Sequence, residues 1–155
     1  MLSLVFPGQG SQYIGMGKDF SHNFPIANEV YSEVDDVLGF SLSKLIFNGQ
    51  IEDLTLTKNA QPAIMATSIA ILKTLEKEGF KIKKSKFVAG HSLGEYTALC
   101  ASGAISLADT AHILKMRGIF MQEAVSVGVG AMAAILGLNL DNVETLVAEI
   151  KAVSN

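Results

Sequence analysis

Apolar positions along the first 125 residues follow two patterns, short continuous runs and runs at helical spacing. The short runs at 2–6 and 87–89 predict strands that are buried in a parallel sheet. Between them, residues 26–38 carry apolar side chains at helical spacing and end at Gly39, which favours the left-handed conformation that follows many helices. Strands separated by helices are typical of an α/β domain, and we predict that fold class.

The same spacing predicts three further helices before residue 105. A short helix covers 42–47. The strongest covers 62–78, with Pro62 in its first turn and apolar residues on nearly every side of its first half, so it should run through the interior. A third covers 96–102.

A capping box and a run of small residues mark the end of the first unit. Ser106 and Asp109 resemble the capping box, and they open a helix that ends near Ala124. The small residues at 126–130 predict a linker, so the first unit ends at 125.

The remaining residues predict one strand and one helix. The strand covers 131–138, and Asp141 or Glu144 caps the helix that follows. A lone strand and helix have little apolar surface to pack against. We therefore divide the chain into a first unit, residues 1–125, and the beginning of a second unit, residues 126–155.

Composition describes a globular chain and excludes several function classes. Of the 155 residues, 49% are hydrophobic, and the net charge of −3 argues against a general binder of polyanions. Aromatic residues make up only 7%, so stacking on nucleic-acid bases is not expected. The single cysteine, Cys100, predicts a buried free thiol and a reducing compartment. Since neither a signal-peptide pattern nor an apolar stretch of ~20 residues is present, we expect a cytoplasmic protein that binds neither nucleic acid nor a membrane.

The sequence Gly-His-Ser-Leu-Gly at 90–94 is the strongest chemical signal. It follows the predicted strand at 87–89 and precedes a helix, the setting in which Gly-x-Ser-x-Gly forms a nucleophile elbow. Glycine suits both flanking positions because strand and helix nearly touch there and leave no room for a Cβ atom. Ser92 is therefore a candidate nucleophile, and the backbone N–H of Leu93 is a candidate oxyanion donor at a helix N-terminus.

A serine nucleophile also needs a second oxyanion donor and a base. The segment 8–10, Gly-Gln-Gly, follows the first predicted strand and would meet the elbow at one sheet edge, but an ordinary tight turn fits it equally well. Tyr13 stands where a dinucleotide fingerprint has its third glycine, which argues against nucleotide binding. Among the histidines, we expect His91 to be structural, His22 to lie in a polar loop and His112 to lie on a solvated helix face. Metal-ligand spacing is absent.

Four motifs together closely resemble the malonyl-CoA:acyl carrier protein transacylases, which belong with the acyltransferase domains of fatty acid and polyketide synthases. The motifs stand in the family's order and are FPGQGSQ at 6–12, QPA at 61–63, GHSLGE at 90–95 and MRG at 116–118. Residues 130–134 also resemble the start of the family's small subdomain. The resemblance implies an α/β-hydrolase-like parallel sheet with helices on both faces, followed by the beginning of a ferredoxin-like subdomain.

The resemblance also implies a role for individual residues. Ser92 would be the acylated nucleophile, and Gln9 and Leu93 would supply the backbone oxyanion donors. Arg117 would pair with the free carboxylate of a malonyl group, which suits the fork of a guanidinium. Gln61 would line the site near the acyl group.

The implied reaction transfers malonyl from coenzyme A to Ser92 and then to the phosphopantetheine thiol of acyl carrier protein, and it consumes no cofactor. His91 would stand at the substrate site in a hydrogen-bonding role. We expect a monomer whose partners are a coenzyme A thioester and acyl carrier protein. Family members are about twice as long and carry their catalytic histidine in the part with no counterpart here, so we expect the chain alone to be poorly active.

Two other functions stay open on the sequence alone. A serine hydrolase such as a thioesterase shares the elbow, and a fragment without activity of its own would carry the same motifs. The basic stretch at 81–86 could steer an acidic carrier protein or coenzyme A phosphates, or it could only solvate the loop before a buried strand.

Overall fold

The computed structural model describes residues 2–125 and 135–153. The chain divides into two compact units, Met1–Ala124 and Val125–Asn155, and each is described by itself. That the second unit begins a ferredoxin-like subdomain stays a prediction.

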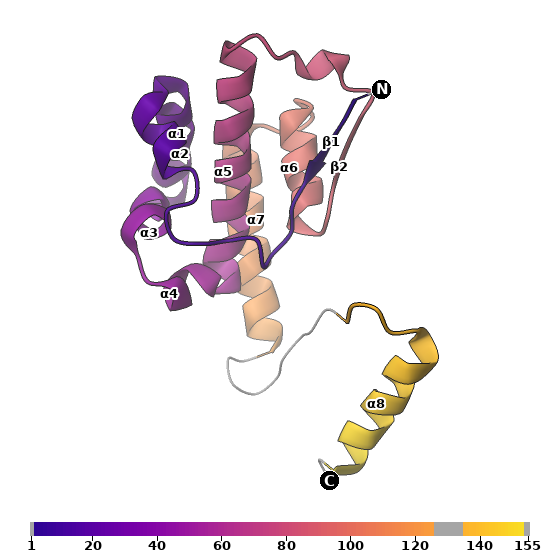
Figure 1. Cartoon of the computed structure of the whole chain (residues 1–155). Coiled ribbons are helices and arrows are strands. Elements are labelled where there is room, and N and C mark those ends of the chain that lie inside the picture. The colour runs from indigo at the N-terminus through magenta and orange to yellow at the C-terminus, as the bar shows by residue number, and fades with distance from the viewer. Residues whose placement is uncertain (1, 126–134, 154–155) are drawn as a thin grey trace. The chain divides into compact units, whose positions relative to one another are not determined.

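The first unit is mostly helical and holds a small parallel sheet (Figure 1). Its elements in chain order are β1 (Ser3–Phe6), α1 (Lys18–Asn23), α2 (Pro25–Leu38), α3 (Leu42–Asn48), α4 (Ile51–Thr55), α5 (Thr57–Lys77), the 3₁₀ helix η1 (Ile82–Lys84), β2 (Phe87–Gly90), α6 (Leu93–Ala101) and α7 (Leu107–Ala124).

The two predicted strands pair in parallel, with Phe6 opposite Gly90, so both carboxyl ends lie at one edge. Phe6 points to one face of this sheet and is buried, so that face packs on the helices. On the other face Val5 is 75% exposed and Phe87 59% exposed. Among the described residues the helices therefore cover one face of the sheet. The expected coverage of both faces is not found there, because no described element reaches Val5 and Phe87.

Helix α5 forms the centre of the unit and contacts α2, α6 and α7 (Figure 1). It begins at Thr57, five residues before its predicted start, so Pro62 lies inside the helix and not in its first turn. A proline there removes one backbone hydrogen bond. The first turns of α5 nevertheless remain helical, because burial of Asn59, Ala60 and Gln61 stabilises them.

Several predicted helix ends are confirmed in detail. Gly39 follows α2 with φ 69° and donates its N–H to the carbonyl of Asp35 at 2.9 Å. Ser106 Oγ accepts the Asp109 N–H at 3.0 Å, which caps α7 as the sequence predicted. Helix α6 begins at Leu93, three residues before its predicted start, because the helix follows the elbow serine directly. The short α1, α4 and η1 were not predicted, since such short helices carry little periodic signal.

The second unit contains α8 (Leu140–Val153). Asn139 caps this helix by accepting the Asn142 N–H on its Oδ1 at 3.0 Å, so neither Asp141 nor Glu144 has the predicted capping role. Residues 126–134, with the predicted linker and half of the predicted strand, lie outside the described residues. The described half of that strand, 135–138, is irregular.

Candidate active site

The predicted elbow lies at the carboxyl edge of the sheet, between β2 and α6. Ser92 has φ 55° and ψ −111°, and it is the one non-glycine residue with positive φ in the described part of the chain. Such a conformation costs about 1–3 kcal/mol and persists only where the surroundings enforce it. The strain turns the chain sharply and presents the hydroxyl above the strand end, as nucleophile elbows do.

Both flanking glycines are required by close backbone contacts. A Cβ on Gly90 would lie 1.9 Å from the carbonyl carbon and oxygen of Gly94. A Cβ on Gly94 would lie 2.4 Å from the carbonyl oxygen of Phe6, at the end of β1. The motif therefore serves to bring strand, turn and helix into direct backbone contact.

The loop after β1 passes against the elbow, as its position after a parallel strand predicted. The His91 backbone N–H donates to the Phe6 carbonyl at 3.2 Å. A Cβ on Gly8 would lie 2.4 Å from His91 Nδ1. Gln9 follows in this loop, and its exposed side chain donates to Thr57 Oγ1 at 3.4 Å. Leu93 opens α6, so its N–H has no acceptor within the helix and is free to serve an anion.

Arg117 reaches Ser92 from α7. Its Nη2 donates to Ser92 Oγ at 3.1 Å, and its Nη1 donates to Gln61 Oε1 at 2.7 Å. Gln61 is only 1% exposed, and its Nε2 contacts Met121 Sδ at 3.3 Å. The Arg117 guanidinium carbon lies 5.7 Å from the centre of the Tyr96 ring. Three residues from three motifs thus meet in one hydrogen-bonded group.

Close packing of α7 on α5 sets the position of Arg117. A Cβ on Gly118 would lie 2.5 Å from Lys58 Cα, so the two helix backbones touch at this point. One turn earlier, Lys115 Nζ donates to Asn59 Oδ1 at 3.1 Å. Partial burial, helped by the nearby charge of Lys58, lowers the pKa of Lys115. This cation faces an amide on α5, but it has no described contact with Ser92.

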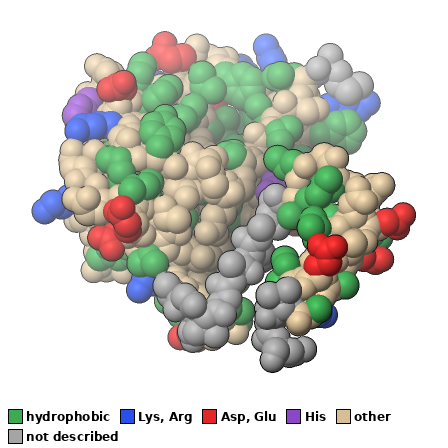
Figure 2. All heavy atoms as spheres, turned by 60° about the horizontal axis from the view of Figure 1, so that its bottom comes forward, with side chains coloured by type: hydrophobic (Ala, Val, Ile, Leu, Met, Phe, Trp, Pro, Cys, Tyr) green, Lys and Arg blue, Asp and Glu red, His purple; other side chains and the backbone are tan. Residues whose placement is uncertain are grey.

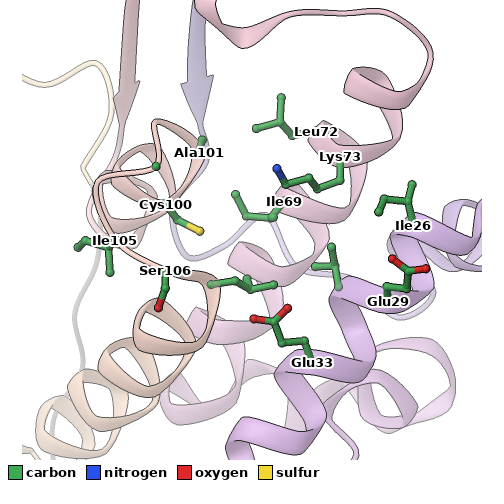
Figure 3. A pocket seen from close by; sticks show the side chains of 13 residues that line it. Ile26, Glu29, Glu33, Ile69, Leu72, Lys73, Cys100, Ala101, Ile105 and Ser106 are labelled. Atoms are coloured by element: carbon green, nitrogen blue, oxygen red, sulfur yellow. The ribbon is translucent and has the colours of Figure 1, made fainter.

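A cavity in the first unit is separate from the serine. It measures about 450 Å³ and lies among α2, α5, α6 and the start of α7 (Figure 3). Its lining includes Cys100 and Ala101 at the carboxyl end of α6, whereas Ser92 precedes the amino end. Nine residues of helix separate the two ends, which corresponds to about 13 Å. Burial raises the pKa of the Cys100 thiol, so this half-buried cysteine is a poor nucleophile at neutral pH.

Several other kinds of site are not found in the described ranges. No group of three or more His, Cys, Asp or Glu side chains there is arranged to hold a metal ion. None of the described helices combines the length and the apolar character needed to cross a membrane. Charged side chains of both signs are scattered over the visible face of the first unit (Figure 2).

Comparisons with known proteins agree with this geometry. The Acyl transferase domain profile matches residues 3–154. A malonyl CoA-acyl carrier protein transacylase of Bacillus subtilis is 47% identical over 154 residues. The chain belongs to the malonyl-CoA:acyl carrier protein transacylase family. Its fold also matches the crystal structure of an acyl-carrier-protein S-malonyltransferase from Bartonella henselae, with a TM-score of 0.88 and 55% identity.

The transacylase resemblance covers nearly all of this chain but only part of each relative. The alignment with the Bacillus subtilis protein takes in 99% of this chain and 48% of that relative. The Escherichia coli K12 relative, 45% identical, is matched over 88% of this chain and 44% of its own length. The Bartonella structure is covered to 49% and this chain to 96%. The chain therefore spans about half the length of the transacylases that it matches.

No described hydrogen bond joins Ser92 Oγ to any of the three histidines. His112 is exposed on α7, as predicted, whereas His22 is exposed but lies on α1 and not in a loop. His91 is exposed as well, and its backbone anchors the elbow to β1. The hydrogen bond described for Ser92 Oγ comes from Arg117.

Sequence reasoning missed two neighbours of the candidate site, Met121 and Tyr96. Met121 lies one helical turn after Arg117, and Tyr96 lies one turn after Ser92, so helical spacing could have placed each on the same face as its partner. No residue pattern indicated that Arg117 itself would contact Ser92, because that contact depends on how α7 packs against α5.

Proposed function

We propose that this chain is the nucleophile-bearing half of an acyl-carrier-protein S-malonyltransferase that serves fatty acid biosynthesis. The observation that carries the proposal is the hydrogen-bonded group of Ser92, Arg117 and Gln61. A serine on a strained elbow supplies acyl chemistry, and a guanidinium 3.1 Å from its hydroxyl supplies recognition of an acid group on the acyl chain.

In the first half-reaction Ser92 Oγ attacks the thioester carbonyl of malonyl-CoA. The Oγ–C bond forms, the C–S bond breaks, and coenzyme A leaves as a thiol after taking up a proton. The serine proton passes to a general base. In the second half-reaction the phosphopantetheine thiol of acyl carrier protein attacks the acyl-serine and restores the hydroxyl. The backbone N–H groups of Gln9 and Leu93 hold the oxyanion in both steps.

Arg117 selects the acyl group in this proposal. A malonyl carboxylate offers two oxygens to the two terminal nitrogens of the guanidinium, whereas an acetyl group offers none. Leaving a half-buried guanidinium without an anionic partner is unfavourable, so the site prefers the malonyl unit. Gln61 lies beside the acid end of the acyl group and holds Arg117 in place.

The general base is expected from a histidine outside this chain, as the resemblance implies. We therefore expect the 155-residue chain alone to transfer malonyl poorly. Removing the base of a serine triad typically lowers the rate by several powers of ten, although oxyanion donors and binding retain some catalysis.

Acyl carrier protein is the proposed acceptor. A malonyl-transacylase in complex with a polyketide-synthase acyl carrier protein has a structure similar to this chain, with a TM-score of 0.85 and 41% identity. The lysines at 81–86 precede the amino end of β2, and Ser92 follows its carboxyl end. The four residues of the strand span about 13 Å. We infer that these lysines mainly solvate the loop, and reversing their charges should leave the salt dependence of transfer unchanged.

The deciding experiment uses the complete protein that contains this chain. Purified protein is incubated with radiolabelled malonyl-CoA, with and without phosphopantetheinylated acyl carrier protein. We expect label on the protein without the carrier and label on the carrier when it is present. Ser92→Ala should abolish both signals, whereas Ser102→Ala, an exposed serine at the far end of α6, should leave them intact. Equal release of malonate to water with and without the carrier would instead identify a hydrolase.

A further inference from the structure

Arg117 forms a hydrogen bond to the Ser92 hydroxyl itself. Its two terminal nitrogens donate to Ser92 Oγ at 3.1 Å and to Gln61 Oε1 at 2.7 Å. Both acceptors are neutral groups of the protein. The guanidinium therefore has its two parallel donors engaged in the same way that a carboxylate would engage them.

This contact lowers the reactivity of Ser92. A lone pair that accepts a hydrogen bond from a cation is not available to attack a carbonyl carbon. The cation also favours the ionised serine. However, an alkoxide paired with guanidinium must first leave that partner, and nucleophilicity falls as the pKa of the attacking group falls.

A substrate carboxylate can exchange with both neutral acceptors. Hydrogen bonds between two charged groups are roughly twice as strong as neutral ones, and the guanidinium fork matches a carboxylate. A carboxylate that takes both Nη atoms of Arg117 releases Ser92 Oγ and Gln61 Oε1 together. A neutral acyl group has nothing to exchange, so Arg117 stays on the serine.

We propose that Arg117 restrains Ser92 until the carboxylate of the acyl group displaces it, so that acyl selection acts on the nucleophile as well as on binding. This proposal rests on the proposed function, because it takes Ser92 as the acylated residue. Gln61 is the positioning residue: it is 1% exposed, and it holds Nη1 while its own amide nitrogen contacts Met121 Sδ at 3.3 Å.

The test separates the carboxylate from the acyl donor. The complete protein is mixed with p-nitrophenyl acetate, a neutral donor, and the release of p-nitrophenolate is followed with increasing sodium formate. In this reaction Ser92 Oγ bonds to the acetyl carbon, the ester C–O bond breaks, and the serine proton passes to the base. Sodium chloride at equal ionic strength controls for general salt effects.

Formate should accelerate the Ser92-dependent reaction saturably, by about tenfold, which is the lower end of what a hydrogen bond from a charged donor is worth. Arg117→Ala should react faster than the wild type and show no response to formate. Lys115→Ala is the matched control, because Lys115 is a half-buried cation on the same helix that also donates to an amide, Asn59. It should keep the formate response. Ser92→Ala defines the background.

Three results would overturn the proposal. They are inhibition or no effect of formate on the wild type, an Arg117→Ala rate no higher than the wild-type rate, and no Ser92-dependent reaction in Arg117→Ala. Arg117→Lys guards against misfolding, because it keeps the charge but lacks the fork, and its formate response should be weaker. Malonyl transfer to the carrier is measured in parallel. Transfer without a formate effect refutes the restraint alone, whereas a formate effect without transfer refutes the proposed function alone.

Discussion

Replacing Gly118 with alanine tests whether the contact between α5 and α7 sets the reach of Arg117. A Cβ at this position would lie 2.5 Å from Lys58 Cα and 2.7 Å from the Thr57 carbonyl oxygen, both of them backbone atoms that cannot rotate away. Ordinary contact begins at 3.4 Å, so α7 must retreat from α5 by about 0.9 Å, the difference between 3.4 and 2.5 Å. The Arg117–Gln61 hydrogen bond of 2.7 Å would then lengthen to about 3.6 Å, at which it no longer counts as a hydrogen bond.

Two opposing effects determine whether this substitution raises or lowers the stability of the protein. In a helix interior, alanine is favoured over glycine by about 1 kcal/mol, so helix propensity alone predicts a more stable protein. Overpacking a tight contact typically costs about 1–3 kcal/mol. Because the clash is with backbone, we expect overpacking to win and Gly118→Ala to unfold at lower denaturant concentration than the wild type.

The assays are urea unfolding and malonyl transfer, both on the complete protein. We expect Gly118→Ala to lose up to about 2 kcal/mol of stability, the overpacking cost less the gain in helix propensity. We also expect kcat/KM to fall more for malonyl-CoA than for acetyl-CoA, because only the malonyl group uses Arg117. Glu123→Ala, an exposed site on the same helix, controls for helix propensity. A Gly118→Ala protein that is as stable as the wild type and equally selective would refute this account of the helix contact.

Three further predictions concern the elbow and two buried groups. Gly94→Ala, whose Cβ would meet the Phe6 carbonyl at 2.4 Å, should abolish labelling of Ser92 by malonyl-CoA and lower the unfolding midpoint, and normal labelling would contradict the elbow geometry. Burial raises the pKa of Tyr31 from 10.0 to about 12, so the unfolded chain ionises first and stability falls between those pH values by up to ~2.7 kcal/mol. Tyr31→Phe should remove that slope in urea titrations. Because burial raises the pKa of Cys100, its iodoacetamide rate should rise only at higher pH than for a free cysteine peptide, and coincident profiles would refute that.

Local chemistry explains the parts of the fold that the sequence predicted. Apolar runs located both strands, and two glycines around Ser92 indicated a turn in which backbones touch, because each effect acts over a few neighbouring residues. Gly39 ends α2 for the same reason, since its φ of 69° is unfavourable for residues with a Cβ. Such local sequence effects are short-range and do not depend on how the rest of the molecule packs.

Tertiary packing explains the parts that the sequence did not predict. Pro62 reads as the start of a helix, but α5 begins at Thr57 because residues from Asn59 onward are buried between other helices. The exposed face of the sheet, with Val5 and Phe87, could not be predicted from the apolar runs. Such runs indicate that a strand is buried, but they do not show which element covers each of its faces. The hydrogen bond from Arg117 to Ser92 joins residues 25 positions apart, and it depends on how α7 packs against α5 and α6.

The candidate site combines residues from three neighbouring segments of the first unit. Ser92 directly precedes α6, Gln61 lies on α5 and Arg117 lies on α7, and these three helices pack on one another within a single compact unit. Under the proposed function, recognition of the acyl carboxylate and the turn that presents Ser92 therefore depend on the same helix contacts. The base that activates the serine is expected from outside this unit. A mutation in the α5–α7 contact should change which acyl group is accepted, whereas loss of the base should slow every acyl group alike. Under the proposed function, the two kinds of change are therefore distinguished by comparing malonyl and acetyl donors in the same variant.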